Sequence, residues 1–332
     1  MRDGFVKVAA ASPVIRVADC DYNAERVIET IKKAGALGVK VLVFPELTLT
    51  GVSCYDLFRH RVLLDGAEKA LAKLAKATEG ADMLVFVGLP VAIGTVVNSA
   101  AAALSNGKLL GFVPRRSPDS RFFGADREYH EIDADSFGTV PYCADTLFFC
   151  QGETELGIAV ELGPDSDGVI SRSAELARAG ATMVVQMASF PETVASTEQA
   201  VLKTRYESRQ ALAAVLLAAP GAGESTTDHV YSGLCLIAEN GKILAQDERA
   251  DSLAVSEIDV QHLTNLRRDY NNFDLVDEDF CSVAWECAPV DTAITRRYPM
   301  HPHLPEDPKD LPAYCERMLE IQVAGLVKRM EY

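Results

Sequence analysis

A carboxylate at the end of an apolar segment is the first group in this sequence that could do chemistry. Residues 41–44 are apolar and are followed at once by Pro45 and Glu46. Such a run predicts a buried strand, and reactive groups in open α/β sheets lie just beyond the carboxyl ends of the strands. Glu46 is therefore a candidate general base.

Other residues of reactive types have simpler interpretations. Cys150 ends a second apolar segment and Cys143 lies close to it, so we interpret both as buried structural thiols. Ser166 would act as a nucleophile only beside a base. His301 and His303 are spaced like a metal-binding pair, but no third ligand is near them in the sequence, which favours an ordinary linker. We expect neither a metal nor a cofactor.

The composition argues against several classes of partner. The 332 residues include 48 acidic and 32 basic side chains, which gives a formal net charge of −16. Nucleic acids and anionic membranes attract cations, so we expect neither as a partner. No apolar stretch approaches the length of a membrane span, and the N-terminus lacks the form of a signal peptide. The eight cysteines are dispersed without a CxxC pair, which predicts a reducing, cytoplasmic location.

Strand-like and helix-like segments alternate from the start of the chain to about residue 259. Hairpin turns interrupt the alternation, as at residues 106–107 (Asn-Gly), so we predict a layered α/β sandwich. Residues 115–139 are polar and aromatic, and we expect them to be irregular. Beyond residue 259 a high proline content predicts an extended arm, which is followed by a last helix at residues 313–329.

Several motifs spread over the whole chain resemble those of one family. They are VADCDYNA at residues 17–24, FPEL at 44–47, GLP at 88–90, LGFVP at 110–114, GESTTD at 223–228, IAENG at 237–241 and IQVAGL at 321–326. FPEL alone is weak evidence, whereas GESTTD together with IQVAGL is much more specific. The chain resembles the amino-terminal glutaminase domain of glutamine-dependent NAD+ synthetase, a branch of the nitrilase (carbon–nitrogen hydrolase) superfamily.

The resemblance implies a four-layer α-β-β-α sandwich and a Glu-Lys-Cys triad that hydrolyses glutamine. In that triad the cysteine attacks the side-chain amide, the glutamate handles its proton and the lysine helps to stabilise the oxyanion. The ammonia then passes through a tunnel to a separate synthetase domain, which amidates adenylated nicotinic acid adenine dinucleotide.

The triad is incomplete when the resemblance is carried over residue by residue. Glu46 matches the general base, but Arg115 stands at the lysine position and Gly163 at the cysteine position. No cysteine occurs from residue 151 to 234 and no lysine from 109 to 202, so a shifted alignment recovers neither group. Loss of a covalent nucleophile costs on the order of a million-fold in turnover, so we expect no glutaminase activity by this mechanism. Glu46 then either forms a structural ion pair with Arg115 or keeps a role in catalysis or ligand binding.

Three more positions of the family's glutamine pocket have diverged. The tyrosine that follows the lysine corresponds to Arg121, the substrate-binding serine falls near Phe190, and the basic residue after it falls near Ser196. The resemblance therefore implies an altered substrate pocket.

The resemblance also suggests how the chain is organised. We predict a nitrilase-like domain at residues 1–265, an extended Pro-rich arm at 266–312, and at 313–332 a helix that resembles the start of the synthetase domain. No SGGxDS-type phosphate loop occurs in the sequence, so we expect that this polypeptide does not itself make NAD+.

Three functions remain open at this stage. The first is an inactive glutaminase domain that serves as a structural or regulatory module, with a synthetase domain supplied in trans or with self-association into a homo-oligomer. The second is an active amidase or glutaminase with a rewired site that supplies ammonia for NAD+ synthesis. The third is a sensor that binds a small amide or nucleotide without turnover.

Overall fold

The structure is a computed structural model that describes residues 3–117, 121–126, 128–134, 136–270, 273, 280–288, 290–305 and 307–331. The chain separates into two compact units, Met1–Ile294 and Thr295–Tyr332, which are described individually. The end residues 1, 2 and 332 of the predicted domains lie outside the described residues.

The first sheet of the larger unit has three parallel strands at its centre and further strands on either side of them. Within the described residues the sheet has eight strands, in the order β14 (Ser252–Asp259), β1 (Phe5–Ser12), β2 (Val41–Val43), β3 (Leu84–Ile93), β4 (Val96–Ser105), β5 (Lys108–Pro114), β7 (Gly138–Tyr142) and β6 (His130–Ala134). The strands β1, β2 and β3 are parallel. Antiparallel pairs join β14 to β1, β4 to β3 and β5 to β4.

The second sheet also has three parallel strands at its centre, with antiparallel strands on either side of them. Seven strands of the described chain form it, in the order β13 (Lys242–Asp247), β12 (Cys235–Glu239), β11 (Ala214–Ala218), β10 (Met183–Met187), β9 (Glu153–Leu162), β8 (Thr146–Gln151) and β15 (Cys281–Glu286). Its centre, β9–β10–β11, is again parallel. The edge strand β15 pairs in parallel with β8.

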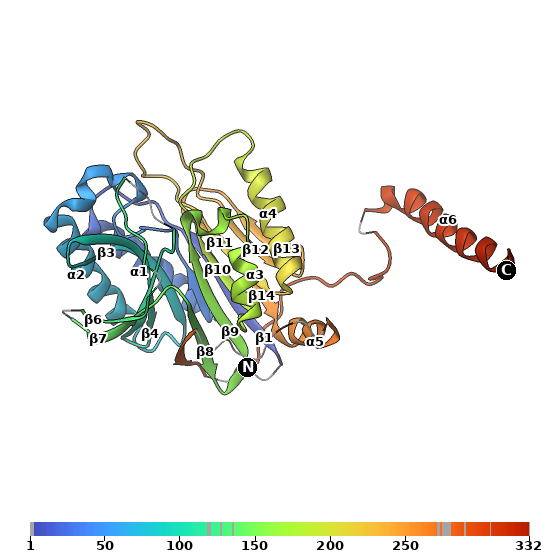
Figure 1. Cartoon of the computed structure of the whole chain (residues 1–332), viewed down its shortest axis with the longest axis horizontal. Helices are drawn as coiled ribbons and strands as arrows, with labels where there is room; N and C mark the ends of the chain where they lie inside the picture. Colours follow the sequence, from blue (N-terminus) through green and yellow to red (C-terminus); the bar gives the residue numbers. More distant parts are fainter. Residues whose placement is uncertain are drawn as a thin grey trace. The chain divides into compact units, whose positions relative to one another are not determined.

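Helices cover the outer faces of the two sheets. The helices α1 (Cys20–Ala36) and α2 (Arg61–Ala77) pack on the first sheet, while α3 (Arg172–Arg178) and α4 (Ser196–Ala211) lie over the second (Figure 1). The short helix α5 (Val260–Tyr270) follows β14 and contributes Val260 and Leu263 to the core between the sheets. The layers therefore run α-β-β-α, as the resemblance implied.

Period-two alternation places apolar side chains on both faces of the central strands. Val6, Val8 and Ala10 of β1 belong to the core between the sheets, whereas Ala9 and Ala11 belong to the core beneath α1 and α2. A strand covered on both faces must be apolar at every position, so its sequence reads as a continuous apolar run. This explains why the sequence identifies the central strands.

One predicted irregular segment is partly ordered into strands. The prediction for residues 115–139 is wrong at 130–134 and 138–139, which belong to the β6–β7 hairpin at the edge of the first sheet. Along β6, Glu131 and Asp133 are exposed while Ile132 and Ala134 turn inward. A short edge strand with charged residues on one face lacks the apolar run that marks a central strand.

The C-terminal part of the chain includes one more strand and a helix. Residue 265, the predicted end of the nitrilase-like domain, lies within α5, and the predicted arm at 266–312 contains β15 and the short helix η3 (Pro308–Asp310). In the smaller unit, α6 (Leu311–Met330) covers most of the predicted terminal helix. Among the described residues, we find no helix both long and apolar enough to cross a membrane.

A buried arginine attaches α5 to the second sheet. Arg267 donates hydrogen bonds to the carbonyl oxygens of Leu212 (3.0 Å), Ala181 (2.6 Å) and Ala211 (3.0 Å). Its side chain is buried, and burial lowers the pKa of its guanidinium to about 10. Arg268, the next residue, instead makes an exposed ion pair with Glu155 at 2.7 Å.

We predict that Arg267→Met lowers the free energy of unfolding by roughly 2–4 kcal/mol, because three buried carbonyl groups lose their donor. Arg268→Met is the matched control and should cost less than about 1 kcal/mol, since exposed ion pairs contribute little. Urea denaturation of the two variants measures both values. Equal losses in the two variants would contradict the structural role given to Arg267.

Candidate functional site

Three strand ends bring the predicted triad positions together. Glu46 lies three residues beyond β2, and Arg115 directly follows β5, both in the first sheet. Gly163 directly follows β9 of the second sheet and begins the short helix η2 (Gly163–Asp167). The backbone N–H of Glu46 donates to the carbonyl oxygen of Ala188, just after β10, at 3.2 Å. The candidate site therefore lies where the two sheets meet.

Glu46 and Arg115 form a buried ion pair. The Arg115 Nη1 and Glu46 Oε1 atoms are 3.3 Å apart, and the two side chains are 5% and 0% exposed. The Ser99 hydroxyl donates to the same carboxylate oxygen at 2.5 Å. Burial raises the pKa of Glu46, and the charge of Arg115 and the hydroxyls of Ser189 and Ser99 oppose that rise.

The guanidinium of Arg115 is held by more than the carboxylate. Its Nε atom donates to the carbonyl oxygen of Ser117 at 2.9 Å, and its Cζ atom lies 5.5 Å from the centre of the Phe123 ring. A planar guanidinium suits these stacked and forked contacts, whereas a lysine ammonium is a compact point charge on a flexible stem. Arg115 is therefore fixed in a geometry specific to arginine.

Gly163 lies directly against the second oxygen of Glu46. A Cβ atom on residue 163 would be 2.4 Å from Glu46 Oε2 and 2.9 Å from the Ser189 hydroxyl, closer than real Cβ contacts. Gly163 also has φ +48°, in the left-handed region that favours glycine. The space that a side chain at the nucleophile position would need is taken by the candidate general base.

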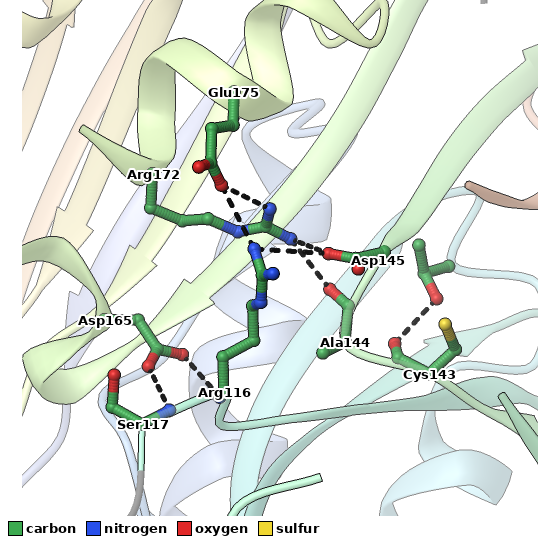
Figure 2. A network of polar contacts seen from close by, with 9 residues as sticks. Arg116, Ser117, Cys143, Ala144, Asp145, Asp165, Arg172 and Glu175 are labelled. Atoms are coloured by element: carbon green, nitrogen blue, oxygen red, sulfur yellow. Dashed lines mark hydrogen bonds and ion pairs between the residues drawn. The ribbon is translucent and has the colours of Figure 1, made fainter. Parts of the chain in front are cut away.

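A carboxylate next to the site joins the two sheets. Asp165 of η2 accepts the backbone N–H groups of Arg116 at 2.8 Å and Ser117 at 2.7 Å (Figure 2). These two residues immediately follow Arg115, so Asp165 fixes the backbone that leads away from the ion pair. Its side chain is itself buried.

The side chain of Arg116 extends this connection towards α3 (Figure 2). Its Nη1 atom is 3.0 Å from Glu175 Oε2 and 3.7 Å from Asp145 Oδ1. Arg172 contacts the same two carboxylates and also donates to the carbonyl oxygen of Ala144 at 3.2 Å. Two arginines and two acids thus share contacts at the edge of the site.

The three remaining predicted positions lie in different places. Arg121 is exposed, its guanidinium lies 5.2 Å from the centre of the Phe122 ring, and its carbonyl oxygen accepts a hydrogen bond from Arg59 at 2.9 Å. Phe190 and Ser196 instead line a cavity of about 440 Å³ that Gly163 also borders. The structure therefore brings two of the three diverged positions to one cavity beside the nucleophile position.

Comparison with known proteins identifies the family of this chain. The profile of the carbon-nitrogen hydrolase family matches residues 7–268, which is more than half of the chain. The chain belongs to the carbon–nitrogen hydrolase family.

Its relatives include glutamine-dependent NAD(+) synthetases. The chain is 33% identical over 349 residues to the enzyme of that name from Mycobacterium tuberculosis and 30% identical over 347 residues to that of Mycobacterium leprae. Each match covers 98% of this chain but 51% of the relative, so the chain spans about half the length of these curated relatives. The protein is thus a carbon–nitrogen hydrolase family member related to glutamine-dependent NAD+ synthetase.

Solved structures show the same fold. A glutamine-dependent NAD(+) synthetase from Cytophaga hutchinsonii superposes with a TM-score of 0.67 at 20% identity, covering 76% of this chain and 43% of that chain. Nit3 of Saccharomyces cerevisiae, from the nitrilase superfamily, superposes with a TM-score of 0.63 at 17% identity, covering 80% and 94% of the two chains. These likenesses establish the nitrilase-type α/β sandwich.

The GESTTD motif of this family member has a packing role. The Glu224 carboxylate accepts the backbone N–H groups of Val52 at 2.8 Å and Ser53 at 3.1 Å, and also the Ser53 hydroxyl. Gly223 has φ +101°, and a Cβ there would lie 1.8 Å from the carbonyl oxygen of Ile15. Glu224 thus fastens the loop to the segment that follows FPEL, and the close approach of the backbone to Ile15 leaves room only for glycine at position 223.

No motif marks the hydroxyls that complete the site. Ser99 belongs to β4, between the GLP and LGFVP motifs, and the pairing of β4 with β3 and β5 brings it to Glu46. The family's substrate-binding serine is predicted near Phe190, whereas the hydroxyl that lies beside Gly163 belongs to Ser189, one residue earlier. The flanking sequence has diverged, which explains this offset of one residue.

Ser166 lies next to Lys203, a contact that could not be predicted from the sequence. Lys203 Nζ lies 2.8 Å from the Ser166 hydroxyl oxygen and 2.6 Å from Asp167 Oδ1. Lys203 donates its hydrogen bond to the Ser166 hydroxyl, and an ammonium group accepts none in return. The Ser166 hydroxyl donates its own hydrogen to the Gly163 carbonyl oxygen, 3.2 Å away. In this arrangement the serine has no base and is not an activated nucleophile.

Two buried cysteines of the larger unit are not activated either. Burial raises the pKa of both Cys143 and Cys54, to about 12 in the case of Cys54. Within the part of the chain that the structure describes, no three His, Cys, Asp or Glu side chains gather as metal ligands do.

Two buried acids, Glu161 and Glu207, lie close together, and Glu161 lines the cavity. The Gln186 amide nitrogen donates to Glu161 and, at 2.6 Å, to Glu207. Ser173 donates to Glu161 at 3.0 Å. Burial and the charge of Glu207 together raise the pKa of Glu161 to about 7, and burial raises that of Glu207.

We predict that Gly163→Ala lowers the free energy of unfolding by roughly 2–5 kcal/mol, because it adds left-handed strain and displaces the Glu46 carboxylate. The control is Gly38→Ala, since Gly38 has φ +77° with nothing within 4 Å of its Cβ position. Only the strain of roughly 1–2 kcal/mol applies to that change.

The same measurement in a Glu46→Asp background isolates the contact, because the shorter carboxylate withdraws from residue 163. Chemical denaturation should then show a smaller cost for Gly163→Ala than in the native background. If the cost does not change, the contact between Glu46 and residue 163 is not its cause.

We predict that Glu161 makes the fold less stable as the pH rises from about 4.5 to about 7. A carboxyl group whose pKa is raised on folding stabilises the protein below its unfolded value, and this contribution is lost as the pH passes through the folded value. Glu161→Gln should therefore gain roughly 1–3 kcal/mol relative to the native protein between pH 5 and pH 8.

Unfolding curves at the two pH values measure this gain. Glu198→Gln, which removes one acid from an exposed position of α4, controls for the change in net charge. An equal gain in both variants would contradict the effect of burial at Glu161.

Proposed function

We propose that this chain is a glutaminase-like domain that has lost cysteine-dependent hydrolysis and serves NAD+ synthesis as a structural or regulatory module. The observation that carries the proposal is the contact at Gly163, where Glu46 Oε2 fills the space of a nucleophile's side chain. The relationship to glutamine-dependent NAD+ synthetases supplies the metabolic context.

Two chemical roles of the triad, the nucleophile and the stabilisation of the oxyanion, lack their groups at this site. Covalent hydrolysis needs a thiolate that attacks the amide carbon, and residue 163 has no side chain. An oxyanion needs donors aimed at it, but Pro164 has no backbone N–H. Arg115 is charged and buried, but its Nη1 and Nε atoms already bind Glu46 and Ser117.

The groups that remain bind one another: Glu46 Oε1 and the Nη1 and Nε atoms of Arg115 have partners within the protein. Glu46 receives hydrogen bonds from Ser99 and Arg115, and Asp165 holds the backbone that follows Arg115. Removing one member of a buried ion pair leaves an uncompensated charge and is strongly destabilising. This is a reason for Glu46 to persist without catalysis.

The partner in this proposal is a synthetase domain in trans or a second copy of the chain. Relatives that carry the name of the complete synthetase are about twice as long as the matched segment. We propose a cytoplasmic homo-oligomer or a complex with such a domain, in which this chain contributes architecture and the partner contributes synthesis.

We predict that the native protein releases no ammonia from glutamine above the level of its Glu46→Gln variant. The variant preserves the shape of the side chain but removes the base, so any reaction that uses Glu46 would differ between the two proteins. A panel of small amides extends the assay to the alternative of a rewired amidase. Ammonia release that depends on Glu46 would overturn the proposal.

Association is tested separately. Size-exclusion chromatography with light scattering is run on the chain alone and after co-expression with the synthetase half of a glutamine-dependent NAD+ synthetase. We expect either a homo-oligomer or comigration with the partner. A monomer that binds no synthetase domain would contradict the proposed module, whatever the ammonia assay shows.

A further inference from the structure

Two cysteines far apart in the sequence meet at the edge of the second sheet. Cys150 belongs to β8, and Cys287 follows directly after β15, which pairs with β8 so that Trp285 lies beside Cys150. The two sulfur atoms are 3.1 Å apart, although 137 positions separate the residues. A disulfide bond has an S–S length of about 2.05 Å, so an approach of about 1 Å would allow the bond to form.

The two thiols differ in access and in acidity. Cys150 is buried and its pKa is raised, first by its hydrogen bond with Cys287 and then by burial. Cys287 is half-buried, and the same hydrogen bond lowers its pKa, with Lys40 adding to the effect and burial and Asp82 opposing it. The thiolate is the nucleophilic form, so Cys287 is the more reactive partner.

Most of the other thiols are not both partly exposed and lowered in pKa. Burial raises the pKa of Cys20 to about 11 and those of Cys54 and Cys235 to about 12. Cys315 is exposed in α6 of the smaller unit. Reaction with a dissolved oxidant should therefore select Cys287 within the larger unit.

We propose that Cys150 and Cys287 form a reversible thiol–disulfide site that reacts with low-molecular-weight disulfides such as glutathione disulfide. The Cys287 thiolate attacks one sulfur of glutathione disulfide, forms a mixed disulfide and releases one glutathione thiolate. The Cys150 thiol loses its proton and attacks the Cys287 sulfur, which releases the second glutathione. Two protein thiols are oxidised and one glutathione disulfide is reduced to two glutathiones.

The bond would fasten a weakly held strand. Of the six residues of β15 only Trp285 is buried, and the strand pairs with β8 alone in the described sheet. A covalent link next to Trp285 would hold β15 on β8 and constrain the unfolded chain between two residues 137 positions apart. Oxidation would thus stabilise the last strand before the chain leaves the larger unit.

The test uses the full chain with Cys315→Ser, so that the exposed thiol of α6 does not react. The protein is equilibrated with mixtures of glutathione and glutathione disulfide, free thiols are alkylated, and non-reducing peptide mapping locates the bonds. We expect one internal bond, between Cys150 and Cys287, with a mass loss of about 2 Da and a rise in Tm of about 5 °C. A different internal pairing, or no bond in any mixture, would overturn the proposal.

Single variants separate the two roles. With Cys150→Ser the attacking thiol remains, so Cys287 should accumulate as a mixed disulfide with glutathione. With Cys287→Ser the buried Cys150 should stay unmodified in the folded protein. Cys281→Ser is the matched control, because Cys281 lies in the same strand, and it should leave the Cys150–Cys287 bond intact. Glutathione on Cys150 in the Cys287→Ser protein would contradict the assigned order of attack.

Discussion

The buried carboxylate of Glu46 is the group around which the candidate site is organised. One of its oxygens receives Arg115 and Ser99, and the other lies where a side chain on residue 163 would begin. A charge in this environment is tolerable only with a partner, so Arg115 is required as long as Glu46 remains. Residue 163 must also lack a side chain, because a Cβ atom there would push the Glu46 carboxylate away from Arg115 and Ser99.

The two-sheet architecture makes this arrangement possible. Glu46 and Arg115 come from the first sheet and Gly163 from the second, so their contact depends on how the two inner faces pack. Phe86 and Phe148 meet across those faces with ring centroids 5.3 Å apart. Asp165 then binds the backbone beyond Arg115 and adds a polar connection between the sheets next to the ion pair.

Much of the fold could be predicted from the sequence because the physical signals are strong. Central strands such as β1 are apolar on both faces, and motifs such as GESTTD point to a family with known architecture. The weakly marked elements were the β6–β7 hairpin and β15, which lie at sheet edges. Most residues of these strands are exposed or half-buried, so neither element has the apolar pattern that identifies a buried strand.

Part of the candidate site could likewise be predicted from the sequence, and part could not. Glu46 and Arg115 could be paired in advance, because each occupies a motif position and their charges are opposite. The contact of Glu46 Oε2 with residue 163 could not, since it depends on the packing of two sheets within a few tenths of an ångström. Ser189 was missed by one residue, because spacing in a diverged loop does not determine which side chain turns inward.

Under the proposed function, this family member forms no covalent intermediate with glutamine. Intact-protein mass spectrometry after incubation with glutamine and acid quenching tests that claim directly. We predict a single species with the mass of the unmodified chain. A glutamyl adduct mapped to any of the eight cysteines would contradict the account.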